Sequence, residues 1–255
     1  MPKDIQYSPS FHADVCQKNP QIMRDFFRAE GYCVVDGVFS EKECEDLNAA
    51  ADAFLRRQGD DEKYKPLMNP DRESAVIASA VCHRKLVKLA EALLGSRIEA
   101  VQTQYFWKPP GALGHDPHQD NYYVRSDQDA FIAAWVALED AGSRNGGLVA
   151  YPRSHLEPIL PVQEVHVPPT SRPLYPNQRG RETLVPIQYK PLPLEVKPGA
   201  TIFMHGHLVH SSLDNLSQHF RRSFLVDYLK DGAPFAVGRY ANRKRMNVYS
   251  DSDGK

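Results

Sequence analysis

The chain has 255 residues, and its 31 lysines and arginines nearly balance its 32 aspartates and glutamates, giving a formal charge of −1. This balance argues against a general nucleic-acid or anionic-membrane binder, and no apolar run reaches the ~18 residues of a membrane-spanning helix. The polar N-terminus predicts no secretory signal, and four cysteines without a Cys-x-x-Cys pair favour reduced thiols in a cytoplasmic protein.

The first third of the chain predicts helices with one strand among them. Apolar residues at helical spacing predict a helix over 20–30, and a further, mostly helical segment covers 74–94. Between them, a capping box of Ser40 and Glu43 opens a helix that runs to about residue 57. With a short strand at 32–35, these elements form an expected helical buttress over about 18–95.

From about residue 96 the pattern changes to short strands separated by clusters of Gly, Pro, Asn and Asp. Such a pattern predicts a sandwich or barrel, here a barrel core over about 96–230. The expected strands are 98–107, 122–124, 130–138, 147–151, 184–187, 192–196, 201–204 and 222–229. We therefore predict a mainly β fold with flanking helices, organised as a single domain over 1–255.

A long irregular excursion is expected within this barrel. Residues 158–191 hold eight of the 20 prolines, together with Arg172, Arg179 and Arg181. Loops of this length in compact domains are commonly lids or binding loops. We therefore expect the excursion to lie near a binding site.

The sequence His118-Gln119-Asp120 is the first candidate for chemistry. On a strand, side chains two residues apart share one face, so this spacing sets an imidazole beside a carboxylate. One histidine from the cluster at 205–210 would complete a group of two histidines and one carboxylate. Such a group suits Fe(II) and leaves open positions for a substrate and O₂.

Several alternatives exist for these histidines. A lone histidine is more often a surface or core residue than a ligand. His205 and His207 also have the His-x-His spacing of a cupin metal site, but no carboxylate follows until Asp214. We prefer His210 as the third ligand.

Arg221 supports this preference, because it begins an apolar alternating run eleven residues after His210. A strand–turn–strand hairpin would place it on the strand beside His210. An arginine there can hold a carboxylate through two parallel hydrogen bonds. An iron-binding face and a carboxylate clamp are together what a 2-oxo acid cosubstrate requires.

Five further motifs accompany these residues. They are Phe-Trp-Lys-Pro-Pro-Gly at 106–111, Ala-Trp-Val-Ala-Leu-Glu-Asp at 134–140, Asn-Gly-Gly-Leu at 145–148, Pro-Arg-Ser-His at 152–155 and Asn-x-Ser at 215–217. With them, the sequence over about 31–228 resembles the phytanoyl-CoA dioxygenase-type Fe(II)/2-oxoglutarate oxygenases. Arg153 and Ser211 depart from the glycines common at these positions in the family. The resemblance implies a double-stranded β-helix, a jelly-roll barrel like that of cupins.

The resemblance also implies roles for individual residues. His118, Asp120 and His210 match the Fe(II) ligands, and Arg221 matches the residue that pairs with the distal carboxylate of 2-oxoglutarate. The cosubstrate pocket would be lined by Gln102, Trp135 and Ser212, with Gln104 as an alternative to Gln102 on the same face. Trp135 is equally explained as a core residue.

The implied activity is a dioxygenase reaction. Such an enzyme uses O₂, converts 2-oxoglutarate to succinate and CO₂, and hydroxylates an unactivated C–H bond of a small molecule. Because Asp120 is retained, hydroxylation or desaturation is favoured over halogenation. A cupin-type metalloenzyme that does not use 2-oxoglutarate and an inactive ligand-binding module are the two rival functions.

The substrate is only loosely defined by the sequence. Asn121, Tyr123 and Lys108 are candidate contacts, and the arginines of the excursion favour a small polar or anionic metabolite or natural-product intermediate. The basic stretch at Arg239, Arg243, Lys244 and Arg245 is either a solvated terminus or an anion-attracting rim of the barrel. The oligomeric state is not predicted.

Overall fold

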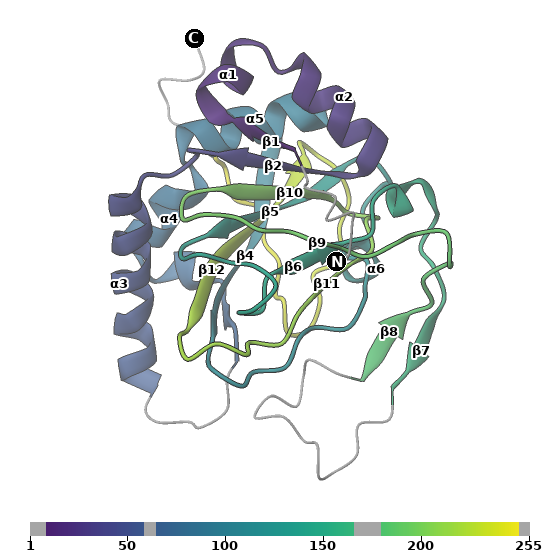
Figure 1. Ribbon diagram of the computed structural model, residues 1–255. Coiled ribbons are helices and arrows are strands. Elements are labelled where there is room, and N and C mark those ends of the chain that lie inside the picture. The colour runs from purple at the N-terminus through teal and green to yellow at the C-terminus, as the bar shows by residue number, and fades with distance from the viewer. Residues whose placement is uncertain (1–8, 59–64, 166–179, 250–255) are drawn as a thin grey trace.

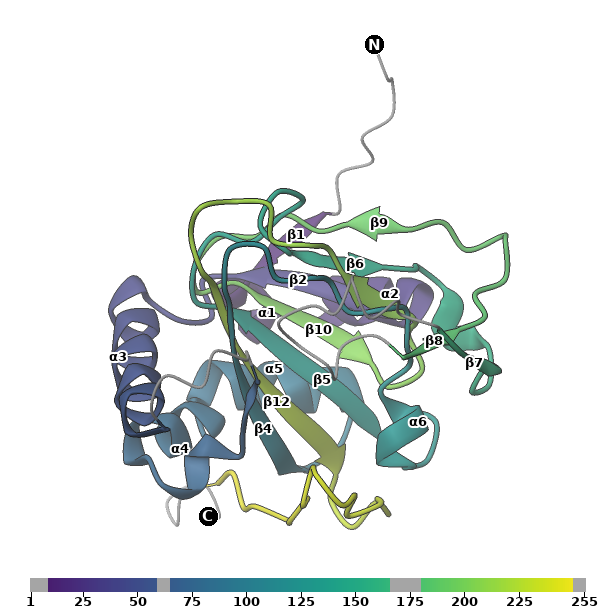
Figure 2. The same ribbon diagram turned by 90° about the horizontal axis from the view of Figure 1, so that it is seen from below.

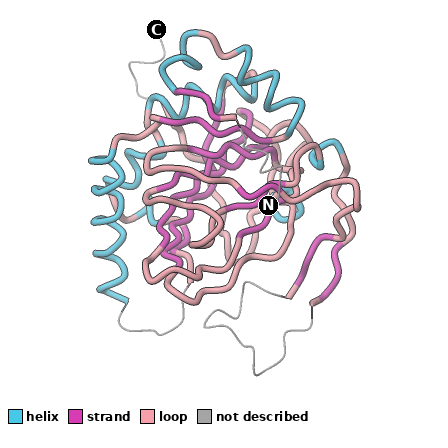
Figure 3. The backbone as a smooth tube through the Cα atoms, viewed as in Figure 1, coloured by secondary structure: helices cyan, strands magenta, loops and turns pink. Residues whose placement is uncertain are grey.

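The structure is a computed structural model that describes residues 9–58, 65–165 and 180–249 (Figure 1). Two sheets lie one above the other, with helices against the outer side of the larger sheet (Figures 2 and 3). The larger sheet has the order β1 (Ser10–His12), β2 (Tyr32–Asp36), β10 (Thr201–His205), β5 (Phe131–Ala137), β12 (Arg221–Lys230), β4 (Ile98–Lys108) and β3 (Leu67–Met68). The smaller sheet has the order β11 (His210–Ser212), β6 (Leu148–Ala150) and β9 (Leu192–Pro193). This mainly β arrangement with flanking helices is the jelly-roll fold that the sequence predicts.

The helices follow the predicted caps closely. They are α1 (Ala13–Lys18), α2 (Gln21–Glu30), α3 (Glu41–Gln58), α4 (Ala75–Val81), α5 (Arg84–Leu94) and α6 (Asn121–Val124), with short 3-10 turns at Pro70–Arg72 and Ser154–Leu156. The main-chain N–H of Ser40 donates to Glu43 Oε2 at 2.8 Å, as a capping box requires. The helix expected over 74–94 is divided in two between α4 and α5. Across the described ranges, no helix has both the length and the apolar content to cross a bilayer.

The larger sheet is buried on both faces, which explains its apolar strands. All seven residues of β5 are buried. Ala134 and Val136 pack in the cluster shared with the helices, whereas Ala133 and Trp135 pack in the cluster shared with the smaller sheet. Because side chains alternate along a strand, a strand buried on both sides has no polar face. Trp135 is thereby directed into the space between the two sheets.

Two expected strands are wrong. Residues 122–124 form helix α6, because Asn121 exchanges side-chain hydrogen bonds of 2.9 Å with both main-chain groups of Ser126 and closes a turn there. Residues 184–187 are not a strand; the strand there is β8 (Arg181–Thr183), which pairs with β7 (Val162–Glu164). The excursion therefore carries a small sheet of its own, while Arg172 and Arg179 lie outside the described residues.

The predicted hairpin between His210 and Arg221 is also wrong. His210 begins β11 in the smaller sheet, whereas Arg221 begins β12 in the larger sheet. The segment between them crosses from one sheet to the other, and the fully buried Asn215 holds it. The amide of Asn215 donates to the carbonyl oxygens of Lys108 and His219 at 3.0 and 2.8 Å. Its oxygen accepts from the main chain and hydroxyl of Ser217 at 3.1 and 2.7 Å.

We expect Asn215→Ala to lower the free energy of unfolding by about 2–4 kcal/mol, because four hydrogen bonds are lost and buried carbonyl groups lose their partners. Urea denaturation would measure this change. Leu216→Ala is the matched control, because Leu216 is 76% exposed and its truncation should change stability by less than about 0.5 kcal/mol. Equal effects of the two substitutions would contradict this role of Asn215.

Candidate metal centre and its cavity

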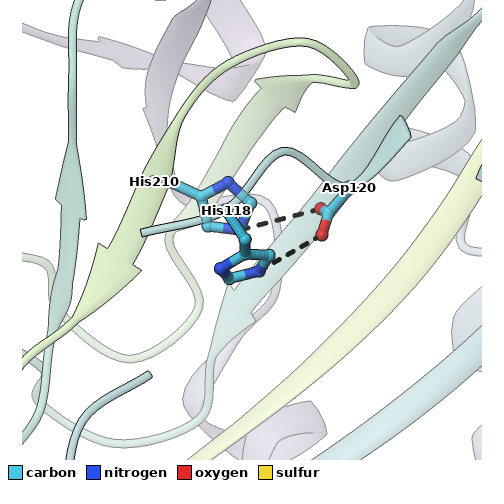
Figure 4. A group of neighbouring side chains, drawn as sticks. All are labelled: His118, Asp120 and His210. Carbon is cyan, nitrogen blue, oxygen red and sulfur yellow. Dashed lines mark ion pairs between the residues drawn. The ribbon is translucent and has the colours of Figure 1, made fainter. Parts of the chain in front are cut away.

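The candidate metal ligands meet where the segment before α6 pairs with β11. The main-chain N–H of His118 donates to the carbonyl oxygen of His210 at 2.9 Å, and the reverse bond measures 3.0 Å. Asp120 then presents its carboxylate to both imidazoles from one side (Figure 4). Asp120 Oδ1 lies 3.4 Å from His118 Nε2, and Oδ2 lies 3.7 Å from His210 Nε2. All three ligand atoms lie within 4.8 Å of one another.

Hydrogen bonds fix both imidazoles in the form that a metal needs. His118 Nδ1 donates to the carbonyl oxygen of Asp116 at 2.8 Å, and His210 Nδ1 donates to that of Leu208 at 3.2 Å. A carbonyl oxygen can only accept, so the proton is assigned to Nδ1 and the lone pair to Nε2. A metal would therefore bind Nε2 of each ring beside the Asp120 carboxylate, in place of the proton that Asp120 favours on His118, whose pKa it raises against the effect of burial. This donor set of two imidazoles and one carboxylate fits Fe(II).

The charges in the centre are strongly coupled. Burial lowers the pKa of His210 to about 4, and burial likewise lowers the pKa of the neighbouring His115 to about 3. Burial alone would raise the pKa of Asp120, but His210 and His118 hold it well below its ordinary value. The centre therefore presents an ionised carboxylate, the state in which Asp120 can bind a cation.

These three residues open into a cavity of about 500 Å³ between the sheets. Arg221, Lys108, Trp135 and Ser212 line one end. Arg221 is 3% exposed and donates to Ser223 Oγ at 2.5 Å, and its guanidinium carbon lies 5.2 Å from the centre of the Trp135 ring. Lys108 Nζ donates to Ser212 Oγ at 3.3 Å and to a neighbouring carbonyl oxygen. This end is strongly cationic.

The other end of the cavity lies along the same strands. Arg221 pairs with Lys108, and Asp227, six residues further along β12, pairs with Gln102 of β4. At about 3.3 Å per residue, the two pairs lie about 20 Å apart along the strands. A β-bulge beside Asp227 shifts the register there, as bulges near functional sites often do. Asp227, Gln102 and Arg243 all line this second end.

The structure brings most of the predicted site residues together. The cavity is lined by His118, Asp120, His210, Arg221, Gln102, Trp135, Ser212, Tyr123 and Lys108. Asn121 is not among the lining residues, because its amide is bound to Ser126. The register places Lys108 beside Arg221, and it places Gln102 beside Asp227, six residues further along each strand. Gln104, which pairs with Leu225, is nearer to Arg221 than Gln102 is.

His205 and His207 do not join the metal centre. His205 Nε2 lies 3.2 Å from Asp129 Oδ1, and His207 Nδ1 donates to the carbonyl oxygen of Glu157 at 3.2 Å. Among the described residues, the only cluster suited to a metal is that of His118, Asp120 and His210. The alternative of a cupin metal site built on His205 and His207 is therefore not supported by their positions.

Three cavity residues were either missed in the sequence or given only an alternative role there. Asp227 was not singled out, although it is the one acidic residue in the apolar run of β12. Arg243 and Arg239 belong to the basic C-terminal stretch and line the cavity, as the rim interpretation requires. Arg245 instead forms an ion pair with Glu99.

Solved structures share this architecture. SnoN, described as an epimerase in complex with Fe³⁺, alpha ketoglutarate and nogalamycin RO, superposes with a TM-score of 0.70 at 19% identity, covering 91% of this chain and 96% of that chain. EvdO2 from Micromonospora carbonacea var. aurantiaca, complexed with 2-oxoglutarate, superposes with a TM-score of 0.65 at 19% identity, covering 84% and 91%.

Sequence comparison is more specific than these superpositions. Phytanoyl-CoA dioxygenase from Arabidopsis thaliana is 26% identical over 280 residues, which cover 87% of this chain and 93% of that protein. Phytanoyl-CoA dioxygenase 1 from Oryza sativa subsp. japonica is 31% identical over 163 residues, but these cover only 61% of this chain and 54% of the rice protein. The family model for phytanoyl-CoA dioxygenase (PhyH) matches residues 27–223.

Fold, ligand cluster and family match together define a non-haem dioxygenase that uses Fe(II), 2-oxoglutarate and O₂. Within that class, the chain belongs to the phytanoyl-CoA dioxygenase (PhyH) family.

The buried Asp227 predicts a pH-dependent stability of the metal-free protein. Burial and the charge of Asp120 raise the pKa of Asp227 to about 8, against the attraction of Arg243. Between about pH 4 and 8 the folded state then holds a proton that the unfolded state has lost, so rising pH destabilises the fold. Asp227→Asn removes this titration, and its stability advantage over wild type should grow by up to about 1.4 kcal/mol per pH unit across this window.

Urea denaturation of the chelator-treated proteins at several pH values would measure this difference. The advantage should be flat below about pH 4, where the carboxyl is protonated in both states. A stability difference between the two proteins that does not change with pH would show that Asp227 has the same pKa in the folded and unfolded states, and would contradict the prediction.

Proposed function

We propose that this protein hydroxylates an unactivated C–H bond of a small polar or anionic metabolite or natural-product intermediate, with release of succinate and CO₂. One observation carries the proposal: the two imidazoles and the carboxylate share a single cavity with the buried cation Arg221. A metal centre and a carboxylate clamp in one enclosed space are what a 2-oxo acid cosubstrate needs.

His118, Asp120 and His210 would hold the iron through Nε2, a carboxylate oxygen and Nε2. When bound, iron would activate O₂ with the two electrons that the oxidative decarboxylation of 2-oxoglutarate provides, and O₂ would be the oxidant of the C–H bond. The protein contributes orientation, because the Nδ1 hydrogen bonds to Asp116 and Leu208 keep both imidazoles aimed at Asp120. These bonds leave the Nε2 lone pair of each ring free for a metal and restrict the orientation of the ring.

Arg221 would bind the distal carboxylate of 2-oxoglutarate. Its guanidinium is buried beside Trp135, so a carboxylate there is held in a dry site where charge-assisted hydrogen bonds are strong. Lys108 adds a second cation, and Ser212 adds a hydroxyl to which the Lys108 ammonium is already bound at 3.3 Å. Gln104 fits the cosubstrate role expected of Gln102 better, because it lies nearer to Arg221 along β4.

The cavity also limits the size of the substrate and the polarity of its surroundings. Leu225, Met204 and Val124 give it apolar walls that exclude water around the reacting bond. A volume of about 500 Å³, shared with 2-oxoglutarate, favours a small molecule over a long acyl thioester. The four free cysteines are compatible with a reducing compartment such as the cytoplasm.

An anaerobic titration with Fe(II) and 2-oxoglutarate tests the function. We expect wild type to develop the visible charge-transfer band of a metal-bound 2-oxo acid. His210→Ala should abolish the band, because it removes one of three ligands. Arg221→Ala should keep the band but require about 10- to 100-fold more 2-oxoglutarate, the loss expected for hydrogen bonds to a charged group.

Ser217→Ala is a suitable control, since it removes a hydroxyl that does not line the cavity. If wild type binds iron but develops no band, the protein does not use 2-oxoglutarate, and the alternative of a metalloenzyme without this cosubstrate is favoured. A band without succinate release for any substrate would favour a ligand-binding module.

A further inference from the structure

The end of the cavity opposite Arg221 holds a buried carboxylate that the cosubstrate does not use. Asp227 is 3% exposed, lies on the inward face of β12 and lines the cavity. Within the described ranges, its carboxylate forms neither a hydrogen bond nor an ion pair. Burying an ionisable group without partners is unfavourable for folding. Such a group is commonly retained because a ligand pairs with it.

Two other polar groups accompany this carboxylate. Gln102 faces Asp227 across the β4–β12 pair, and its buried Oε1 has no hydrogen-bond partner among the described residues. Arg243 approaches from the C-terminal segment, which runs past the ends of β4 and β12 (Figure 2). Its guanidinium donates to the carbonyl oxygens of Tyr123 and Ala236 at 3.3 and 3.1 Å, so its position is fixed. It attracts Asp227 from beyond ion-pair distance.

These groups define the chemistry of a ligand. A carboxylate accepts hydrogen bonds, a guanidinium donates them, and both line the same cavity, so a group that donates and accepts would complement them. We propose that Asp227, Gln102 and Arg243 bind the head group of the substrate, and that this head group joins an N–H or O–H donor to a carbonyl or carboxylate acceptor. This inference rests on the proposed function, because it assigns the second occupant of the same cavity.

The position of this subsite suits the reaction. Asp227, Gln102 and Arg243 line the same cavity as the three candidate metal ligands. Between Arg221 and Asp227, the inward face of β12 presents the apolar side chain of Leu225. A substrate whose head group is held by Asp227 would therefore lay its apolar portion along Leu225. A C–H bond, and not the polar head group, would then lie nearest the metal ligands.

Three probes that share a phenylpropane skeleton test the assignment. Phenylalanine offers an ammonium beside a carboxylate, 3-phenyllactate offers a hydroxyl beside a carboxylate, and 3-phenylpropionate offers the carboxylate alone. Each would be titrated anaerobically against the protein loaded with Fe(II) and 2-oxoglutarate. The rise in melting temperature with millimolar probe gives the affinity, because a ligand of the folded state stabilises it by mass action.

Wild type should bind the two donor-bearing probes more tightly than 3-phenylpropionate. Asp227→Leu should lower the affinity for phenylalanine and 3-phenyllactate by about 10- to 100-fold, because their donors pair with the carboxylate. The affinity for 3-phenylpropionate should not change. Asp227→Asn should weaken phenylalanine more than 3-phenyllactate, because an ammonium loses a charge-assisted bond. Asp231→Asn is the matched control, since Asp231 is exposed beyond the end of β12, and it should behave as wild type.

Without ligand, both Asp227 variants should melt at a higher temperature than wild type, because a buried ionisable group without a hydrogen-bond partner is removed. A lower melting temperature would mark Asp227 as a structural residue and overturn the proposal. Equal affinities of wild type for all three probes, binding of none of them, or an unchanged preference in Asp227→Leu would overturn it as well.

The charge-transfer band separates this proposal from the proposed function. Absence of the band in wild type means that iron and 2-oxoglutarate do not bind, which is a failure of the function. A normal band in wild type and in both Asp227 variants, without dependence on the donor, is a failure of the subsite alone.

Discussion

The metal centre depends on two main-chain hydrogen bonds between His118 and His210. These bonds, of 2.9 and 3.0 Å, join a segment outside the regular strands to the smaller sheet and set the two imidazoles 4.2 Å apart, centre to centre. Because only main-chain groups are used, both side chains stay available for a ligand. The intervening Gln119 turns the other way, where its amide donates to the carbonyl oxygen of His207 at 2.7 Å and accepts from the N–H of Leu160 at 2.8 Å. One short segment thus holds the candidate ligands and anchors the start of the excursion.

Much of the fold follows from local pattern alone. The apolar run of β5 and the capping box of α3 are each set by residues close in sequence, so both could be predicted. The strand that pairs with β12 could not be predicted. It is β4, which lies more than a hundred residues earlier in the chain, and no local feature encodes that pairing. The path from β11 to β12 could not be predicted either, since a hairpin and a crossing between the two sheets both fit the spacing of His210 and Arg221. The crossing is selected by hydrogen bonds that Asn215 makes to the distant Lys108.

The candidate site was predictable in its residues more than in its layout. The spacing of His118 and Asp120, and the resemblance that pointed to His210 and Arg221, identified groups that share one cavity. Which end of that cavity each lining residue occupies depends on strand register. The register that sets Lys108 beside Arg221 and Gln102 beside Asp227 could not be predicted from the sequence, and neither could the bulge beside Asp227. Asp227 itself left only a weak signal, an acidic residue inside an apolar strand, which a surface-exposed strand would explain equally well.

The two ends of β12 carry different groups, and this asymmetry has a consequence for how the cavity is filled. Arg221 and Lys108 attract a dianion such as 2-oxoglutarate. Asp227 offers a dianion no positive charge, and it becomes negative where its raised pKa, about 8, is exceeded. Unfavourable contacts against the wrong ligand contribute to specificity as much as favourable contacts with the right one. The cosubstrate is therefore directed to the Arg221 end even before the metal orients it. A substrate that binds as proposed would bring a donor to Asp227, so one strand would discriminate between two occupants that share a single space.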